Sequence, residues 1–212
     1  MIPLALKLRK ASHREIAKAQ DMIAEELYRV FENAVLHGGT AIWRCYQGNR
    51  FSEDIDAYIP RDKEKINLFF GNLERRGFVI EKKKIAENSV YSGMRIERTH
   101  VRFEATFRKI EGILKEYEKI DGNFITVYTL SPEELIKEKV SAYIKRLKIR
   151  DLYDIFFLLR RVEDDRKINE SLKSLAENFK MPVDKEELKV LILEGIIPTP
   201  EKMMDYIGRR IK

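Results

Sequence analysis

The chain contains few of the residues that form covalent or metal cross-links. Its only cysteine is Cys45, which excludes an internal disulfide and a cysteine-rich zinc site. The histidines His13, His37 and His100 lack the H-x-x-H spacing typical of zinc sites. Glycine and proline are scarce, with 10 and 6 among 212 residues, and no repeat or low-complexity segment is visible. The fold therefore has to be stabilised by a hydrophobic core.

Long hydrophobic runs are also missing. The apolar stretch at the N-terminus is too short for a signal peptide, and no later stretch approaches the roughly 18 apolar residues that span a membrane. We therefore expect a soluble, cytoplasmic protein with no membrane partner.

The composition that remains is that of a globular protein. Apolar residues make up 44% of the chain and charged residues 36%, and 212 residues suffice for one sizeable core or two small ones. The formal net charge of +6 favours polyanionic partners such as nucleotides or RNA. Net charge affects how strongly molecules attract one another and does not indicate the fold.

Apolar spacing divides the chain into two parts. A capping box at Ser12 and Glu15 predicts the start of a long helix, and alternating apolar residues predict strands over 54–59 and 101–108. A second capping box at Ser131 begins a region that is helical throughout. We predict an α+β fold, with a mixed sheet and flanking helices over residues 1–130 and a helical lobe over 131–212.

Three carboxylates are candidates for a metal site. Asp54 and Asp56 have i, i+2 spacing on one predicted strand, so both side chains lie on the same face, about 6–7 Å apart. Glu104 lies on the polar face of a later alternating strand. Carboxylate oxygens are the ligands that Mg²⁺ prefers, and paired carboxylates hold Mg²⁺ ions in nucleotidyl transfer.

A glycine pair precedes these carboxylates. Gly38 and Gly39 let backbone amides approach phosphate oxygens, and a helix that begins near Thr40 would favour bound negative charge. The Thr40 or Ser52 hydroxyl would add a hydrogen-bond donor. Each signal alone is weak, because a Gly-Gly pair is most often a bare turn and Asp-x-Asp is often an ordinary solvated strand face. The order of the motifs carries the prediction.

The motifs together resemble those of AbiEii/AbiGii-type nucleotidyltransferases, within the DNA-polymerase-β-like superfamily. The resemblance rests first on Leu36-His37-Gly38-Gly39-Thr40-Ala41 and Arg50-Phe51-Ser52-Glu53-Asp54-Ile55-Asp56. Residues 101–108 resemble the family's third-carboxylate strand, although the family more usually has Asp where this chain has Glu104. Glu138-Lys139 and Arg150-Asp151-Leu152-Tyr153-Asp154 resemble its helical-lobe motif.

The resemblance implies a metal-dependent toxin that transfers NMP from an NTP to an acceptor, with tRNA or another RNA as the expected acceptor. It also implies two Mg²⁺ ions, a toxin–antitoxin or phage-defence role and a cognate antitoxin. The implied catalytic residues are Asp54, Asp56, Glu104, Lys139 and Asp151, of which Asp54, Asp56 and Glu104 bind the metal. The implied nucleotide-binding residues are Gly38, Gly39, Thr40, Ser52 and Arg50.

Other interpretations remain open. Lys139 would otherwise be a solvated helix charge, and Asp151 a helix cap or a partner of Lys148. Arg50 would otherwise pair with Glu53 or stay solvated. Two other functions fit the same scaffold: a non-catalytic nucleotide- or RNA-binding regulator, and a nucleotidyltransferase that acts on small molecules.

Overall fold

The computed structural model describes residues 4–211, which form two compact units. One unit, here called the sheet unit, comprises Met1–Gln47 and Phe51–Thr129. The other, the helical unit, comprises Gly48–Arg50 and Leu130–Lys212. Each unit is described by itself below.

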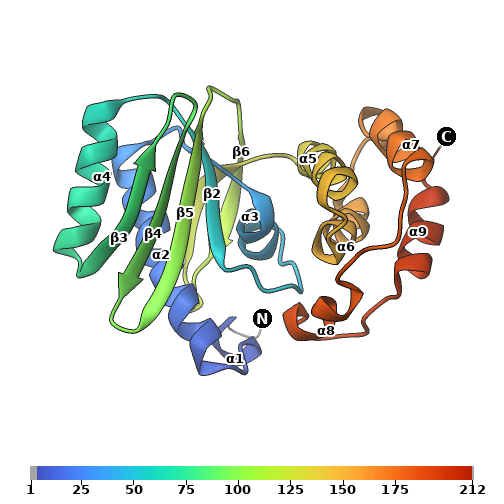
Figure 1. The fold of residues 1–212 in the computed structure, drawn as a ribbon, viewed down its shortest axis with the longest axis horizontal. Helices are drawn as coiled ribbons and strands as arrows, with labels where there is room; N and C mark the ends of the chain where they lie inside the picture. Colours follow the sequence, from blue (N-terminus) through green and yellow to red (C-terminus); the bar gives the residue numbers. More distant parts are fainter. Residues whose placement is uncertain (1–3, 212) are drawn as a thin grey trace. The chain divides into compact units, whose positions relative to one another are not determined.

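The sheet unit contains a mixed sheet of seven strands in the order β3-β4-β5-β2-β1-β7-β6 (Figure 1). The pairs β2–β5 and β1–β7 are parallel, and the other neighbours are antiparallel. The strands are β1 (Val35–His37), β2 (Asp54–Ile59), β3 (Phe78–Ile85), β4 (Ser89–Ile96), β5 (Thr99–Phe107), β6 (Ile113–Glu118) and β7 (Phe124–Thr129). The helices are α1 (Leu4–Lys7), α2 (Ala11–Val30), α3 (Gly38–Cys45) and α4 (Lys63–Arg75). The expected mixed sheet with flanking helices is confirmed.

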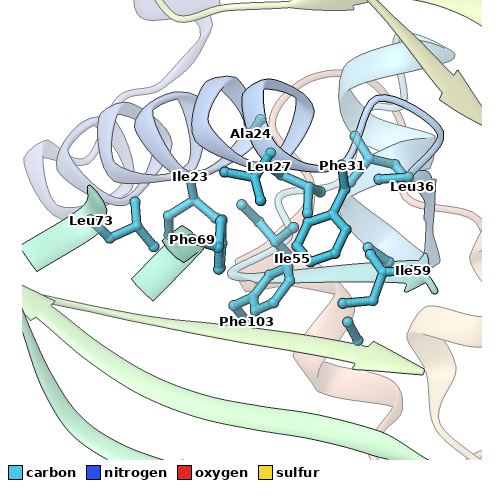
Figure 2. Close-up of a cluster of buried hydrophobic side chains, with 14 of the residues drawn as sticks. Ile23, Ala24, Leu27, Phe31, Leu36, Ile55, Ile59, Phe69, Leu73 and Phe103 are labelled. Atoms are coloured by element: carbon cyan, nitrogen blue, oxygen red, sulfur yellow. The ribbon is translucent and has the colours of Figure 1, made fainter. Parts of the chain in front are cut away.

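Helices α2 and α4 cover one face of the sheet and form the core with it (Figure 1). Figure 2 shows Leu27 of α2 and Phe31, the residue directly after α2, pointing toward Ile55 and Ile59 of β2, with Phe103 of β5 beside them. These side chains are all nearly fully buried. Because side chains alternate along a strand, burial of this face turns the polar residues of β2 and β5 to the opposite face.

The start of α2 differs from the prediction. The helix begins at Ala11, after Lys10, and no side chain caps it. Ser12 therefore lies inside the first turn rather than at the capping position, and Glu15 pairs with Lys18 instead. The predicted capping box is wrong because the helix begins at Ala11, which moves Ser12 from the cap position into the helix.

The helical unit follows from the second capping box, which is confirmed. The Ser131 side chain accepts a hydrogen bond from the Glu134 amide, and the Glu134 carboxylate accepts one from the Ser131 amide. The helices are α5 (Pro132–Arg146), α6 (Ile149–Leu158), α7 (Asn169–Glu177), α8 (Leu188–Leu191) and α9 (Pro200–Gly208), with short 3₁₀ turns at Leu159–Arg161, Asp165–Lys167 and Lys185–Glu187. Their buried residues include Leu135, Ile136, Leu152, Ile155, Leu172, Leu175, Met203 and Ile207.

Among the helices of residues 4–211, none combines the length and the apolar character needed to cross a membrane.

The core predicts the effect of truncating Phe103, whose ring lies 4.9 Å from that of Phe69. Phe103→Ala removes a fully buried ring and should lower the free energy of unfolding by about 3–5 kcal/mol, through lost burial and the cavity left behind. Urea unfolding followed by circular dichroism measures the change. Val79→Ala is the control, because Val79 is 48% exposed on β3 and should change stability by less than about 0.5 kcal/mol. Equal effects of the two substitutions would contradict the described core.

Candidate active site

Three predicted carboxylates lie on adjacent strands of the sheet unit. Asp54 and Asp56 are on β2, and both are only partly buried, on the face opposite α2 and α4. Glu104 is on β5, where the parallel register places it beside Asp56. Neighbouring strands are about 4.8 Å apart, so the backbones of Asp56 and Glu104 are direct neighbours. The structure thus brings the three predicted metal ligands to one face.

Arg102 joins this group, although the sequence did not single it out. It lies beside Asp54 in the same register, and its Nε and Nη2 donate hydrogen bonds of 2.7 and 2.8 Å to the two oxygens of Asp54. These hydrogen bonds raise the pKa of Arg102 above its usual value. The only signal in the sequence was its i, i+2 spacing from Glu104 on a polar strand face.

Helix α3 begins beside Asp56. Gly38 has a φ of 71°, which favours glycine, and a Cβ at this position would lie 3.0 Å from Asp56 Cγ and closer still to its carboxylate oxygen. The glycine therefore leaves room for the Asp56 carboxylate at the helix start. Because the first amides of a helix have no partner within the helix, the Gly38-Gly39-Thr40 turn is suited to hold phosphate oxygens.

A buried glutamine connects this helix start to the loop before β2. Gln20 of α2 is fully buried, and its side-chain amide donates a 2.9 Å hydrogen bond to the Ser52 carbonyl and a longer one to Thr40 Oγ1. The Thr40 hydroxyl in turn donates to the Asp54 carbonyl, so its proton is used within the protein. Gln20 is thus a positioning residue that the sequence reasoning missed. Its only signal was a polar side chain next to the apolar stripe of α2.

The residues present fit a divalent cation. The donors are carboxylate oxygens, which Mg²⁺ prefers, and the missing Cβ of Gly38 keeps space beside Asp56. Within residues 4–211, no three His, Cys, Asp or Glu side chains are yet gathered around one point that would hold a metal, and Asp54 faces Arg102. Asp54, Asp56 and Glu104 would hold the metal, and Asp54 would then have to give up hydrogen bonds from Arg102.

The other predicted residues form a separate cluster inside the helical unit. Asp154 accepts two 2.8 Å hydrogen bonds from Arg50 and lies 2.8 Å from Lys139 Nζ. Asp151 accepts two 2.7 Å hydrogen bonds from Arg146 and lies 3.6 Å from Lys139 Nζ. Burial opposes the ionisation of Asp154, but Arg50 and Lys139 outweigh it and hold the pKa of this carboxyl below its usual value.

This cluster differs from what the sequence suggested for its members. Lys139 is buried between Asp151 and Asp154 and is therefore no solvated helix charge. Arg50 is buried against Asp154 rather than solvated. Asp151 is fully buried and pairs with Arg146, while Lys148 pairs with Asp184. The structure gives each predicted residue of this unit an ionic partner, and a contact of theirs with nucleotide stays a prediction.

A comparison with known families decides the class of protein. The sequence profile described as nucleotidyl transferase AbiEii toxin, type IV toxin–antitoxin system, matches residues 23–206. The chain belongs to the AbiEii nucleotidyltransferase family. It is therefore a nucleotidyltransferase of a toxin family, as the motifs indicated. A search of curated proteins gave no match.

Solved structures agree with the AbiEii fold. The nucleotidyltransferase toxin MenT4 from Mycobacterium tuberculosis is similar with a TM-score of 0.69 at 18% identity, over 97% of this chain and 85% of that chain. JHP933 from Helicobacter pylori is similar with a TM-score of 0.65 at 19% identity, over 95% of this chain and 90% of that chain. At these identities the likeness is one of fold.

The close approach of Gly38 to Asp56 predicts the effect of adding one methyl group to this AbiEii protein. Gly38→Ala should displace the Asp56 carboxylate and strain the backbone, at a cost of about 1–3 kcal/mol in unfolding free energy. Nucleotidyl transfer should fall below detection under conditions in which the variant remains folded. Gly71→Ala in α4 is the matched control, because its Cβ would meet nothing within 4 Å. Full activity of Gly38→Ala would show that Asp56 has no need of this space.

The buried cluster predicts a loss of stability in Asp154→Asn. Arg50 and Lys139 would lose their shared counter-charge, which should lower the free energy of unfolding by about 3–5 kcal/mol. Because the pKa of Asp154 is lowered on folding, its stabilisation is complete above the unfolded pKa of about 3.9 and is lost as the pH falls through the folded pKa. The difference between the wild type and the variant should therefore shrink in acid below about pH 4.

Urea unfolding at neutral and acidic pH measures this difference. Asp205→Asn is the control, because its pair with Arg209 is exposed and should contribute less than about 0.5 kcal/mol. A difference between the wild type and Asp154→Asn that stays constant down to pH values well below about 3 would contradict a charged Asp154 in the folded protein.

Proposed function

We propose that this protein transfers NMP from an NTP to a hydroxyl group of an RNA acceptor, in a reaction that depends on Mg²⁺. One observation carries the proposal: Asp54, Asp56 and Glu104 share one face of the sheet, and the start of α3 lies next to Asp56. Carboxylates for a cation and the first amides of a helix for phosphate thus lie side by side. Both are needed to neutralise charge on a reacting triphosphate.

The residues of the sheet unit would have separate roles. Asp54, Asp56 and Glu104 would hold the metal, whose chemistry is to neutralise charge on the triphosphate and to lower the pKa of the attacking hydroxyl. The backbone amides of Gly38, Gly39 and Thr40 would hold phosphate oxygens. Gln20 and the Thr40 hydroxyl would keep the helix start fixed against β2, and the Ser52 side chain would add a further phosphate contact.

The charge of the chain and its family point to the acceptor and the biological role. The net charge of +6 favours a polyanionic acceptor, for which tRNA or another RNA is the natural candidate. Membership in a toxin family supports a cognate antitoxin as partner and a role in toxin–antitoxin or phage-defence systems.

The residues of the helical unit enter the proposal through the family resemblance. Lys139 would neutralise negative charge on the nucleotide. Asp151 would position the Lys139 side chain through the ion pair between them. Arg50 and Lys139 both pair with Asp154, so Arg50 would help to position Lys139 near the nucleotide charge. Lys139→Met should then reduce transfer by more than its loss of stability explains.

Removal of two carboxylates tests the reaction. Asp54→Asn combined with Asp56→Asn should abolish transfer, because the substitutions remove the charges that would hold the metal and change little in shape. Incubation with each labelled NTP, Mg²⁺ and total RNA measures transfer and identifies the base and acceptor class together. Glu87→Gln is the control, because Glu87 is an exposed carboxylate in the β3–β4 loop and should leave labelling unchanged. Full labelling by the double variant would refute the proposed site.

A further inference from the structure

Arg102 occupies both oxygens of a carboxylate that the proposed function assigns to the metal. The two hydrogen bonds, of 2.7 and 2.8 Å, have the parallel geometry of a bidentate arginine–carboxylate pair. The pair is open to solvent, since the side chains of Arg102 and Asp54 are 53% and 30% exposed. Because both side chains are exposed to water, separating them leaves neither charge buried without a partner, so the fold does not require this pair.

A glycine on the neighbouring strand leaves space beside Arg102. Gly93 lies in the interior of β4, in register with Arg102 and therefore on the same face. A Cβ there would meet nothing closer than Lys82 Cβ, at 3.9 Å, so crowding does not explain the glycine. Glycine within a strand lowers stability and often marks a place that a ligand approaches. The arginine side chain thus has room to move away from Asp54.

A divalent cation and Arg102 compete for the same oxygens. Metal ligation uses the lone pairs to which the guanidinium donates, and two cations that share one carboxylate repel each other. The triphosphate of an NTP offers the guanidinium an alternative, because phosphate oxygens also accept bidentate hydrogen bonds from arginine.

We propose that Arg102 is a nucleotide-binding residue that exchanges between the Asp54 carboxylate and the phosphates of the NTP. This inference rests on the proposed function, because it requires Asp54 to bind the metal. Arg102 then opposes metal binding without nucleotide and supports nucleotide binding once the metal has taken Asp54. Metal and nucleotide therefore bind cooperatively, and by thermodynamic linkage each raises the affinity of the other by the same factor.

Metal binding by Arg102→Gln tests this exchange without any measurement of activity. Mn²⁺ serves as the probe, and free Mn²⁺ is measured by electron paramagnetic resonance with and without a non-hydrolysable NTP analogue. Without the analogue, the variant should bind Mn²⁺ about tenfold more tightly than the wild type. In the presence of Mn²⁺, the variant should bind the analogue about tenfold more weakly. Arg102→Lys keeps the charge without the bidentate geometry and should give intermediate values.

Two controls separate this inference from the proposed function. Arg95→Gln removes an equal charge from β4, where Arg95 pairs with Glu81 at 2.9 Å, and should bind Mn²⁺ and the analogue like the wild type. Asp54→Asn should weaken Mn²⁺ binding with and without the analogue.

The outcomes that overturn the role of Arg102 are distinct. Unchanged or weaker Mn²⁺ binding by Arg102→Gln, while Asp54→Asn still loses Mn²⁺, would overturn it and leave the metal site standing. If Arg95→Gln and Arg102→Gln changed Mn²⁺ binding equally, the effect would come from net charge, and the specific role of Arg102 would be refuted. If the wild type bound no Mn²⁺ even with the analogue, the metal site would fail together with the role of Arg102.

Discussion

The register of β2 within the sheet is the constraint on which the rest of the sheet unit depends. Its neighbours are β5 on one side and β1 on the other, and Ile55, Ala57 and Ile59 are buried beneath α2 and α4. A slip of one residue would turn Asp54 and Asp56 into the apolar core. The burial that stabilises the fold therefore also presents the carboxylates, so core and site cannot be varied independently.

The start of α3 depends on the same strand. The Thr40 hydroxyl bonds to the Asp54 carbonyl, and Gly38 leaves room for the Asp56 carboxylate. Gln20 adds a contact from α2, which is a principal component of the core. The candidate phosphate-binding turn is therefore fixed to the candidate metal ligands through hydrogen bonds and close packing, on rigid elements of regular structure. Such support maintains the short distances that transfer chemistry needs.

Most local features of this fold could be predicted from the sequence, although the Ser12 capping box was wrong, and pairings between distant segments could not be predicted. The alternation of polar and apolar residues predicted the polar faces of β2 and β5, and the Ser131 capping box predicted the start of α5. Both patterns depend on residues only a few positions apart. Arg50 binds Asp154, which is 104 positions away, and Arg102 binds Asp54 across 48. Such partners follow from strand order and helix packing, which the spacing of charges along the chain does not encode. Asp54 and Asp56 could be predicted because their i, i+2 spacing is local, and Glu104 because its own strand alternates between polar and apolar residues.

The ion pairs around Lys139 and the pair of Arg102 with Asp54 differ in their exposure to solvent, which determines the cost of separating them. In the helical unit, Lys139, Asp151 and Asp154 are buried, so breaking a pair would leave a charge without solvation at a cost of several kcal/mol. These ion pairs therefore keep their partners and fix the positions of the side chains. Arg102 and Asp54 make the same kind of bidentate contact on an open sheet face, where water replaces a lost partner at little cost. An exposed pair can therefore exchange partners when a ligand binds, which the proposed role of Arg102 requires. The buried pairs of Lys139 with Asp151 and Asp154 cannot exchange partners at such a low cost.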